Sequence, residues 1–314
     1  MPAPLRERVI AAGAAENAER PVLSILTPFY KHDPSALIMS LAETKAPVEL
    51  VLLDDGSQSA DLIIKTVRAA HHCGFPVRII VREDNAGRAA ARNRLAEAAR
   101  GDYALFLDAD MTPDNADFIA RWLDLIDREA PAAAFGGLSL KAAHEDKATA
   151  LHYRQFAASD CRNAEERNRD PAQFTATSNL LVRRDVLLST PFDDGFVGWG
   201  WEDVDWALRA SSFGPIRHID NSASHSGLDT VDALLRKYRE GARNYARLAT
   251  KHPEAVRRMA SWRAARWLRK TPLNGALCAF TAWLARDPLG LTPMLARRAA
   301  LKLHRTTLYA RGLA

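Results

Sequence analysis

Short apolar runs alternate with segments of helical periodicity over the first 110 residues. Four of the runs are rich in β-branched and aliphatic residues, which predicts buried strands at 22–27, 48–53, 77–81 and 103–107. The segments between them predict helices over about 33–45, 62–70 and 89–99. Because strands and helices alternate in this way, we expect an α/β fold with a mostly parallel central sheet flanked by helices.

The pattern changes twice further along the chain. Residues 137–177 are less periodic and predict a surface excursion or lid. Two short strands, at 178–182 and 216–219, then flank a helix at 202–212. From residue 230 onward the pattern is helical throughout. We therefore divide the chain into an N-terminal extension (1–20), an α/β domain (21–230) and a helical C-terminal region (231–314).

Charge separates these parts as well. Residues 231–314 contain 18 Lys and Arg against 4 Asp and Glu, whereas residues 1–230 contain 25 against 34. An acidic body repels anionic ligands unless a cation or a local positive site intervenes. A basic region attracts anionic surfaces, either nucleic acid or phospholipid. The 47% of hydrophobic residues excludes a mainly disordered chain.

Cysteine usage and the N-terminus bear on the compartment. The chain has three widely spaced cysteines, Cys73, Cys161 and Cys278, which indicates neither a disulfide framework nor a Cys-x-x-Cys metal site. The first residues show no secretory signal, and no apolar run is long enough to span a bilayer. We expect a cytoplasmic protein.

Carboxylates follow two of the predicted strands. Asp108 and Asp110 come after the run YALFL, and two carboxylates at this spacing can hold one Mg²⁺ or Mn²⁺ while leaving positions open for phosphate oxygens. Asp54 and Asp55 follow the strand at 48–53 and can accept hydrogen bonds from a ribose hydroxyl or a base N–H. Acids also form ordinary turns, but ligands bind beyond the carboxyl ends of such strands.

A helix with two arginines follows a glycine after the third strand. Gly87 stands just before this helix, where free backbone N–H groups favour anions. Arg88 and Arg92 are one turn apart and could clamp a phosphate or nucleotide. Further along, His225 is a candidate third metal ligand, and His218 is a weaker one because it lies in an apolar stretch.

The segment GFVGWGWEDVDWALR combines glycines, tryptophans and acids. Trp199 and Trp201 offer flat faces that suit the apolar face of a sugar ring. Glu202 and Asp203 begin a helix, where the dipole favours ionised carboxylates that could take a proton from an acceptor hydroxyl. Core packing is the alternative for the tryptophans, and we expect it for Trp206.

The C-terminal region contains an amphipathic pattern. Over 254–270, one continuous helix would place Val256, Ala260, Ala264, Trp267 and Leu268 on one face and basic residues on the other. A short apolar stretch, LNGALCAFTAWL, follows. The two readings are an element lying on an anionic membrane surface and a helical subdomain that packs on the body.

Five segments, taken together and in their order along the chain, resemble the motifs of family 2 glycosyltransferases with the GT-A fold. They are SILTPFYK, LLDDGS, NAGRAAARN, YALFLDAD and GWGWEDVDWALR. The last motif is similar to the acceptor-site motif of β-1,4-galactosyltransferases and bacterial chondroitin-type polymerases, except that a second glycine there is Trp201 here. The resemblance covers about residues 20–230. It implies a nucleotide-sugar part at about 21–136 and an acceptor part at about 178–230.

The resemblance also implies roles for residues that match the motifs. Uracil would contact Thr27 and Phe29, with Tyr30 beside them; Asp54 or Asp55 would bind uridine. Arg92 would hold the nucleotide or diphosphate, Asp108 the donor and metal, and Asp110 the metal directly. The remaining assignments are Asp203 as catalytic base, Trp199, Trp201 and Glu202 on the acceptor, and His225 as a metal ligand.

The implied reaction is an inverting single displacement from a UDP-sugar to a hydroxyl of a saccharide or lipid-linked acceptor, with Mn²⁺ or Mg²⁺ as cofactor. Membrane attachment through the basic region would suit such an acceptor. Three alternatives remain: a nucleic-acid-binding protein that uses the basic region, although no nucleic-acid motif is evident; a catalytically silent sugar-nucleotide-binding relative; and a sugar nucleotidyltransferase, which would want a glycine-rich loop where this chain has TPFYKHD.

Overall fold

The computed structural model describes residues 6–15 and 20–313. The chain forms two compact units, each assembled from separate stretches of sequence. Unit 1 comprises 1–143, 160–194 and 206–227, and unit 2 comprises 144–159, 195–205 and 228–314. The last break lies close to the expected boundary at 230. The other breaks differ from expectation, because the segments 144–159 and 195–205 group with the helical C-terminal region rather than with the α/β domain.

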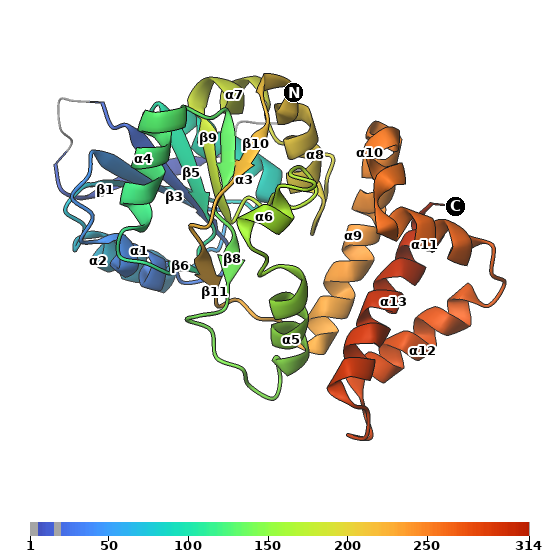
Figure 1. Cartoon of the computed structure of the whole chain (residues 1–314). Helices are drawn as coiled ribbons and strands as arrows, with labels where there is room; N and C mark the ends of the chain where they lie inside the picture. The colour runs from blue at the N-terminus through green and yellow to red at the C-terminus, as the bar shows by residue number, and fades with distance from the viewer. Residues whose placement is uncertain (1–5, 16–19, 314) are drawn as a thin grey trace. The chain divides into compact units, whose positions relative to one another are not determined.

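An eight-stranded sheet forms the centre of unit 1 (Figure 1). Its order is β1-β4-β3-β2-β5-β9-β7-β10, and the four strands β4, β3, β2 and β5 are mutually parallel. The mostly parallel sheet predicted from the apolar runs is therefore confirmed. The strands are β1 (Glu7–Gly13), β2 (Leu23–Phe29), β3 (Val48–Asp54), β4 (Pro76–Arg82), β5 (Tyr103–Leu107), β7 (Ala133–Phe135), β9 (Asn179–Arg183) and β10 (Ile216–His218).

The edge strand β1 lies in the segment expected to be an N-terminal extension. It pairs antiparallel with β4, from Glu7 opposite Arg82 to Gly13 opposite Pro76. Most of its side chains are exposed or half-buried. A strand with little buried surface lacks the alternation that marks half-buried strands, which explains why its sequence did not reveal it.

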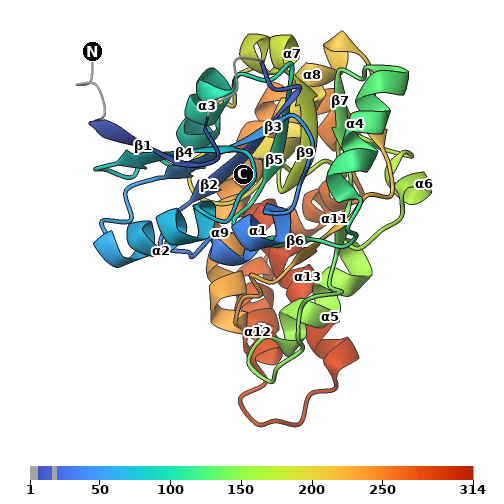
Figure 2. The same ribbon diagram turned by 90° about the vertical axis from the view of Figure 1, so that its left-hand side faces the viewer.

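Helices cover both faces of this sheet (Figure 2). One core cluster contains Leu37, Leu62 and Trp122 beneath α1 (Ser35–Leu41), α2 (Ala60–Ala70) and α4 (Phe118–Glu129). The cluster on the other face contains Leu95, Val186 and Trp206 from α3 (Arg88–Ala98), α7 (Arg184–Ser189) and α8 (Glu202–Ala210). The expected core role of Trp206 is thus observed. Two short helices complete the unit, α6 (Ala164–Arg167) and η1 (Ser211–Phe213).

A second sheet has three strands, and the first of them, β6, directly follows β5 along the chain. It has the order β6-β11-β8, from β6 (Met111–Pro113), β11 (Ala223–His225) and β8 (Leu138–Ser139). β6 and β11 are antiparallel, and their register sets His225 opposite Met111. This pairing brings a histidine near the end of unit 1 to the turn that follows β5.

Unit 2 is helical. It contains α5 (Ala150–Ser159), α9 (Val231–Lys251), α10 (Pro253–Arg258), α11 (Ala260–Arg269), α12 (Asn274–Arg286) and α13 (Met294–Gly312). The continuous helix predicted over 254–270 is wrong: Met259, with ψ of 138°, separates α10 from α11. As a result Val256 and Leu268 are buried, whereas Trp267 is 72% exposed instead of sharing their face. No helix of the described residues has both the length and the apolarity needed to cross a membrane.

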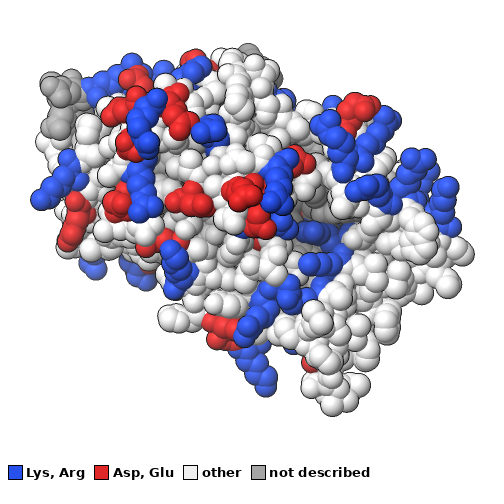
Figure 3. All heavy atoms as spheres, in the orientation of Figure 1, with Lys and Arg blue, Asp and Glu red and all other residues white. Residues whose placement is uncertain are grey.

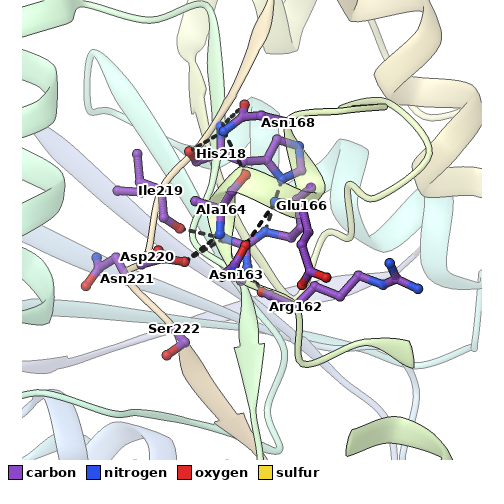
Figure 4. A network of polar contacts seen from close by, with 12 residues as sticks. Arg162, Asn163, Ala164, Glu166, Asn168, His218, Ile219, Asp220, Asn221 and Ser222 are labelled. Atoms are coloured by element: carbon purple, nitrogen blue, oxygen red, sulfur yellow. Dashed lines mark hydrogen bonds and ion pairs between the residues drawn. The ribbon is translucent and has the colours of Figure 1, made fainter. Parts of the chain in front are cut away.

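A buried polar network joins α6 to the segment after β10 (Figure 4). Arg167 donates to the carbonyl of Ile219 at 2.6 Å and to Nδ1 of His218 at 3.2 Å. Nε2 of His218 lies 3.1 Å from the carbonyl of Pro171. Because one ring nitrogen accepts a hydrogen bond and the other donates one, His218 is neutral and structural here. The sequence alone made it a weaker candidate metal ligand than His225.

This network predicts a pH dependence of stability. Burial, with the charge of Arg167, lowers the pKa of His218 to about 4. The unfolded chain therefore binds more protons between pH 4 and 6.5, so stability falls as pH drops through that window. From pH 7 to 5 we expect the His218 contribution to cost about 2 kcal/mol. Urea unfolding of wild type and His218→Gln at both pH values measures it. A loss of the same size in the variant would contradict this origin.

Candidate functional site

The turn between β5 and β6 carries the Asp-x-Asp pair. The carbonyl of Asp108 accepts a hydrogen bond from the Met111 N–H at 3.0 Å, which closes the turn. The carbonyl of Asp110 accepts from the N–H of Ser226 at 3.0 Å and from its hydroxyl at 2.9 Å. The backbone of Asp110 is thus fixed to the segment that follows β11.

Asp110 pairs with His225 within unit 1. Nε2 of His225 lies 3.3 Å from Oδ2 of Asp110. Burial opposes ionisation of Asp110, but the hydrogen bond and charge of His225, together with the charge of His32, hold the pKa of the carboxyl below its usual value. Gly227 lies directly against this carboxylate, and a Cβ at residue 227 would collide with Oδ2. The segment SHSG therefore supplies both a partner for Asp110 and the space it needs.

Asp108 has a different partner. The guanidinium of Arg92 lies 3.5 Å from Oδ1 of Asp108 and 5.7 Å from the centre of the Phe192 ring. Arg92 is buried on α3, whereas the side chain of Asp108 is 31% exposed. Arg92 and Asp108 form a second charged pair at the turn that also carries Asp110.

These residues fit part of a divalent-metal site. No group of three His, Cys, Asp or Glu side chains within 6–15 and 20–313 is arranged to hold a metal ion. Asp110 and His225 alone offer one carboxylate held in its ionised form and one ring nitrogen. Carboxylate and imidazole suit a divalent ion, and nucleotide phosphates usually complete the coordination of such ions.

At the ends of β2 and β3, Thr27 and Asp54 are both buried. The hydroxyl of Thr27 has no hydrogen-bond partner among the described residues. Burial raises the pKa of Asp54, and the charge of Asp55 adds to this, against hydrogen bonds from Ser57. Asp54 also lines a cavity of about 640 Å³, which is bounded by residues 6–8, 58–60, 63 and 81–84. A buried hydroxyl without a partner and a carboxylate with a raised pKa are typical of sites where a ligand supplies the missing hydrogen bonds.

Asp55 is occupied by the protein itself. Its Oδ1 accepts from Arg82 at 3.1 Å and from the Ala86 N–H at 3.1 Å, and its Oδ2 accepts from the Gly87 N–H at 2.9 Å. Asp55 therefore holds the loop before α3, where Gly87 has φ of 89°. Of the two aspartates considered for uridine, this arrangement favours Asp54.

The neighbouring aromatic residues separate into core and surface. The Phe29 side chain is 4% exposed and belongs to the core cluster beneath α1, whereas Tyr30 is 46% exposed. The N–H of Lys31 donates to the Ser57 hydroxyl at 2.7 Å, which ties the end of β2 to the turn after β3. Tyr30 is thus the exposed ring at the strand end.

The tryptophan–glycine loop belongs to unit 2 and is held by α9. The amide of Asn244 donates to the carbonyls of Val197, Trp199 and Gly200, at 3.2, 3.2 and 3.0 Å. Gly241 lies beneath Trp199, where a Cβ would approach the ring to 3.3 Å. Sequence reasoning missed Asn244 because nothing local links α9 to a loop more than 40 residues earlier.

Trp201 adopts an unusual backbone conformation. Its φ is 77°, in the left-handed region that favours glycine. A glycine, as in the related acceptor motif, adopts this conformation without strain. The ring of Trp201 packs against Tyr245 and Tyr309, with centroids 4.9 and 5.8 Å apart. Trp199 contacts Tyr238 at 6.0 Å.

The first turn of α8 carries three acids. Glu202 is buried and Asp203 is partly exposed. Asp205 is fully buried, and its Oδ1 lies 2.7 Å from Nζ of Lys251 and 2.9 Å from Nε2 of His252. Sequence reasoning also missed this anchor, which fixes the start of α8 to the end of α9 within unit 2. The sequence feature that could have revealed it is the position of Asp205 on a predicted helix, directly before the apolar residues 206–208.

Comparisons with known proteins add an independent finding. A family model described as Glycosyl transferase family 2 matches residues 24–188, more than half of the chain. An uncharacterized glycosyltransferase of Haemophilus influenzae is 35% identical over 103 residues, 32% of this chain and 38% of that protein. The putative teichuronic acid biosynthesis glycosyltransferase TuaG of Bacillus subtilis is 27% identical over 39% of this chain and 49% of its own. Glycosyltransferase AglE of Haloferax volcanii is 25% identical over 62% of each chain. The chain therefore spans less than two thirds of each of these relatives.

Solved structures share the fold. TarS of S. aureus, residues 1–349, superposes with a TM-score of 0.52 at 16% identity, covering 91% of this chain and 89% of that one. Mannosyltransferase PcManGT from Pyrobaculum calidifontis, in complex with GDP-Man and Mn²⁺, gives 0.54 at 18% identity, covering 93% and 88%. At such identities the likeness establishes the GT-A-like fold.

Proposed function

Because this chain belongs to glycosyl transferase family 2, we propose that it is an inverting, metal-dependent enzyme that transfers a sugar from a UDP-sugar to a hydroxyl group of a saccharide or lipid-linked acceptor. The observation that carries this proposal is the pairing of Asp110 with His225 beyond the end of β5. The reaction would serve cell-envelope or polysaccharide biosynthesis, as the name of TuaG suggests for that relative.

The donor would bind at the ends of β2, β3 and β5. The Asp54 carboxylate can accept the N3–H of uracil, and the buried Thr27 hydroxyl supplies another polar group. Arg92 would offset the negative charge of the diphosphate and orient Asp108. Support for UDP comes from TarS, which was solved in complex with UDP; PcManGT was solved with GDP-Man.

Asp110 and His225 are the residues that would hold Mn²⁺ or Mg²⁺. When bound, the ion supplies positive charge to the diphosphate as it leaves. Asp110 is already ionised, whereas the His225 ring nitrogen that hydrogen-bonds it would have to release its proton to bind the ion.

The acceptor would be activated by Asp203. Its carboxylate removes the proton of the acceptor hydroxyl while the hydroxyl oxygen forms a bond to the anomeric carbon. The bond from that carbon to the UDP oxygen breaks, and the configuration inverts. Trp199 offers a ring to the sugar and Glu202 a carboxylate to its hydroxyls. Trp201, whose ring faces two tyrosines, would shape this loop.

A donor screen tests the proposal. The full-length protein is incubated with UDP-sugars and GDP-sugars, with Mn²⁺ or with EDTA, and released nucleotide is measured. We expect Mn²⁺-dependent release of UDP from at least one UDP-sugar and no release in EDTA. Activity restricted to GDP-sugars, or unaffected by EDTA, would contradict the proposal, as would UDP-sugar binding without turnover under all conditions.

A further inference from the structure

Large apolar side chains are exposed on one part of unit 2. More than half of those that the described residues expose lie within 267–303. We define the apolar patch as Leu273, Phe280, Trp283, Leu289, Leu291 and Leu295, whose exposed fractions run from 45% to 80%. Scattered exposed apolar residues are normal on a protein surface, but a contiguous group indicates an interaction site.

Helix α12 is apolar on both of its sides. Cys278, Thr281 and Ala285 are buried on one side, which faces the rest of the helical unit. Phe280 and Trp283, three residues apart, occupy the opposite side, and their rings stack with centroids 6.1 Å apart. No charged residue occurs between Asn274 and Ala285. A helix that faces water normally carries a polar outer side, so the outer side of α12 is built for a non-aqueous contact.

The loop between α12 and α13 continues the patch. It presents Leu289 and Leu291, which are 67% and 80% exposed. The carboxylate of its one acid, Asp287, accepts hydrogen bonds from the N–H groups of Leu291 and Thr292 in the same loop, at 3.0 and 2.9 Å. The loop is therefore held in a defined conformation with leucines outward.

The surroundings of the patch are strongly basic. Residues 255–314 contain 12 Lys and Arg and one acid. On α11, Arg263, Arg266 and Lys270 are exposed beside Trp267. Figure 3 shows Lys and Arg at the upper right and an almost uncharged surface below them, where Figure 1 places α12 and the loop after it.

We propose that α12 and the loop 287–293 insert the apolar patch into the interface of an anionic lipid bilayer, with the basic residues of α11 and α13 contacting the headgroups. Apolar residues flanked by Lys and Arg, with tryptophan at the border, match the layered chemistry of such an interface. A protein partner of ordinary composition would not require so uniform a positive charge. The inference is independent of the donor and metal sites.

Flotation of the full-length protein with vesicles tests this. Phosphatidylglycerol mixed into phosphatidylcholine should recruit the wild type, and phosphatidylcholine alone should recruit it at least tenfold less. Leu289→Ser combined with Leu291→Ser should weaken partitioning at least tenfold, because both side chains leave the bilayer. Arg266→Glu with Lys270→Glu should weaken it similarly and remove its salt dependence. The control pair Ile64→Ser with Leu188→Ser, exposed apolar residues of unit 1, should leave partitioning unchanged.

All of these residues are at the surface, so we expect the variants to fold like the wild type. Thermal unfolding checks that their unfolding temperatures are unchanged. Quenching of tryptophan fluorescence by brominated lipid should occur in the wild type and decrease in Trp283→Phe. Equal flotation of wild type and leucine variant would overturn the proposal. Two other results would also overturn it, each combined with an absence of flotation. One is self-association that the leucine variant abolishes, and the other is duplex DNA binding that only the charge variant loses.

Discussion

Replacement of Asp203 by asparagine is expected to lower kcat for sugar transfer by a factor of about 10² to 10⁴, the usual contribution of a general base. The amide keeps the size of the side chain but cannot accept the proton of the acceptor hydroxyl. Donor binding should be unchanged, because the proposed donor contacts lie at the ends of β2, β3 and β5 and on α3 and β11. Kinetics with saturating donor, together with UDP titration, separate the two effects.

Asp232→Asn is the matched control, since Asp232 is an exposed aspartate of the same unit whose carboxylate pairs with Arg286 at 2.7 Å. This variant should retain the wild-type kcat. Full transfer activity in Asp203→Asn would remove Asp203 from the role of base and direct attention to Glu202.

Replacement of Asp110 by alanine should abolish Mn²⁺-dependent transfer, with kcat/KM at least about 10³-fold below wild type. Gly227→Ala should give the same loss without removing the carboxylate, because the new Cβ displaces Asp110. Transfer rates over a range of Mn²⁺ concentrations measure both variants.

Two controls isolate this effect. Asp117→Ala removes an exposed aspartate of unit 1 that pairs with Arg121 one turn away, and it should be neutral for transfer. Gly275→Ala adds a Cβ where no atom lies within 4 Å, and it should also be neutral. Wild-type activity in Gly227→Ala would show that the position of Asp110 does not limit the reaction.

The parts of the fold that could be predicted are those with strong local signals. Strands β2 to β5 are continuous apolar runs closed by polar residues, and they appear almost as expected. β1 was missed because an exposed edge strand has no such run. The break at Met259 was missed because the helical periodicity continues across it and neither glycine nor proline marks it. These failures arise where tertiary pairing, rather than local pattern, decides the structure.

The candidate site divides in the same way. Residue types and their order were enough to bring Asp110 together with His225, 115 positions later. They could not assign Asp55 to Arg82 and the loop N–H groups, nor Asp108 to Arg92, because such contacts form only when distant elements meet. The support that α9 gives to the tryptophan–glycine loop through Asn244 was hidden for the same reason.

The central claim, that Asp110 and His225 hold a divalent ion for the diphosphate, is tested most directly by calorimetric titration of UDP into wild type and Asp110→Ala, each with and without Mn²⁺. The account predicts that Mn²⁺ strengthens UDP binding at least about tenfold in the wild type and has no effect in the variant. An equal gain in both proteins would contradict it.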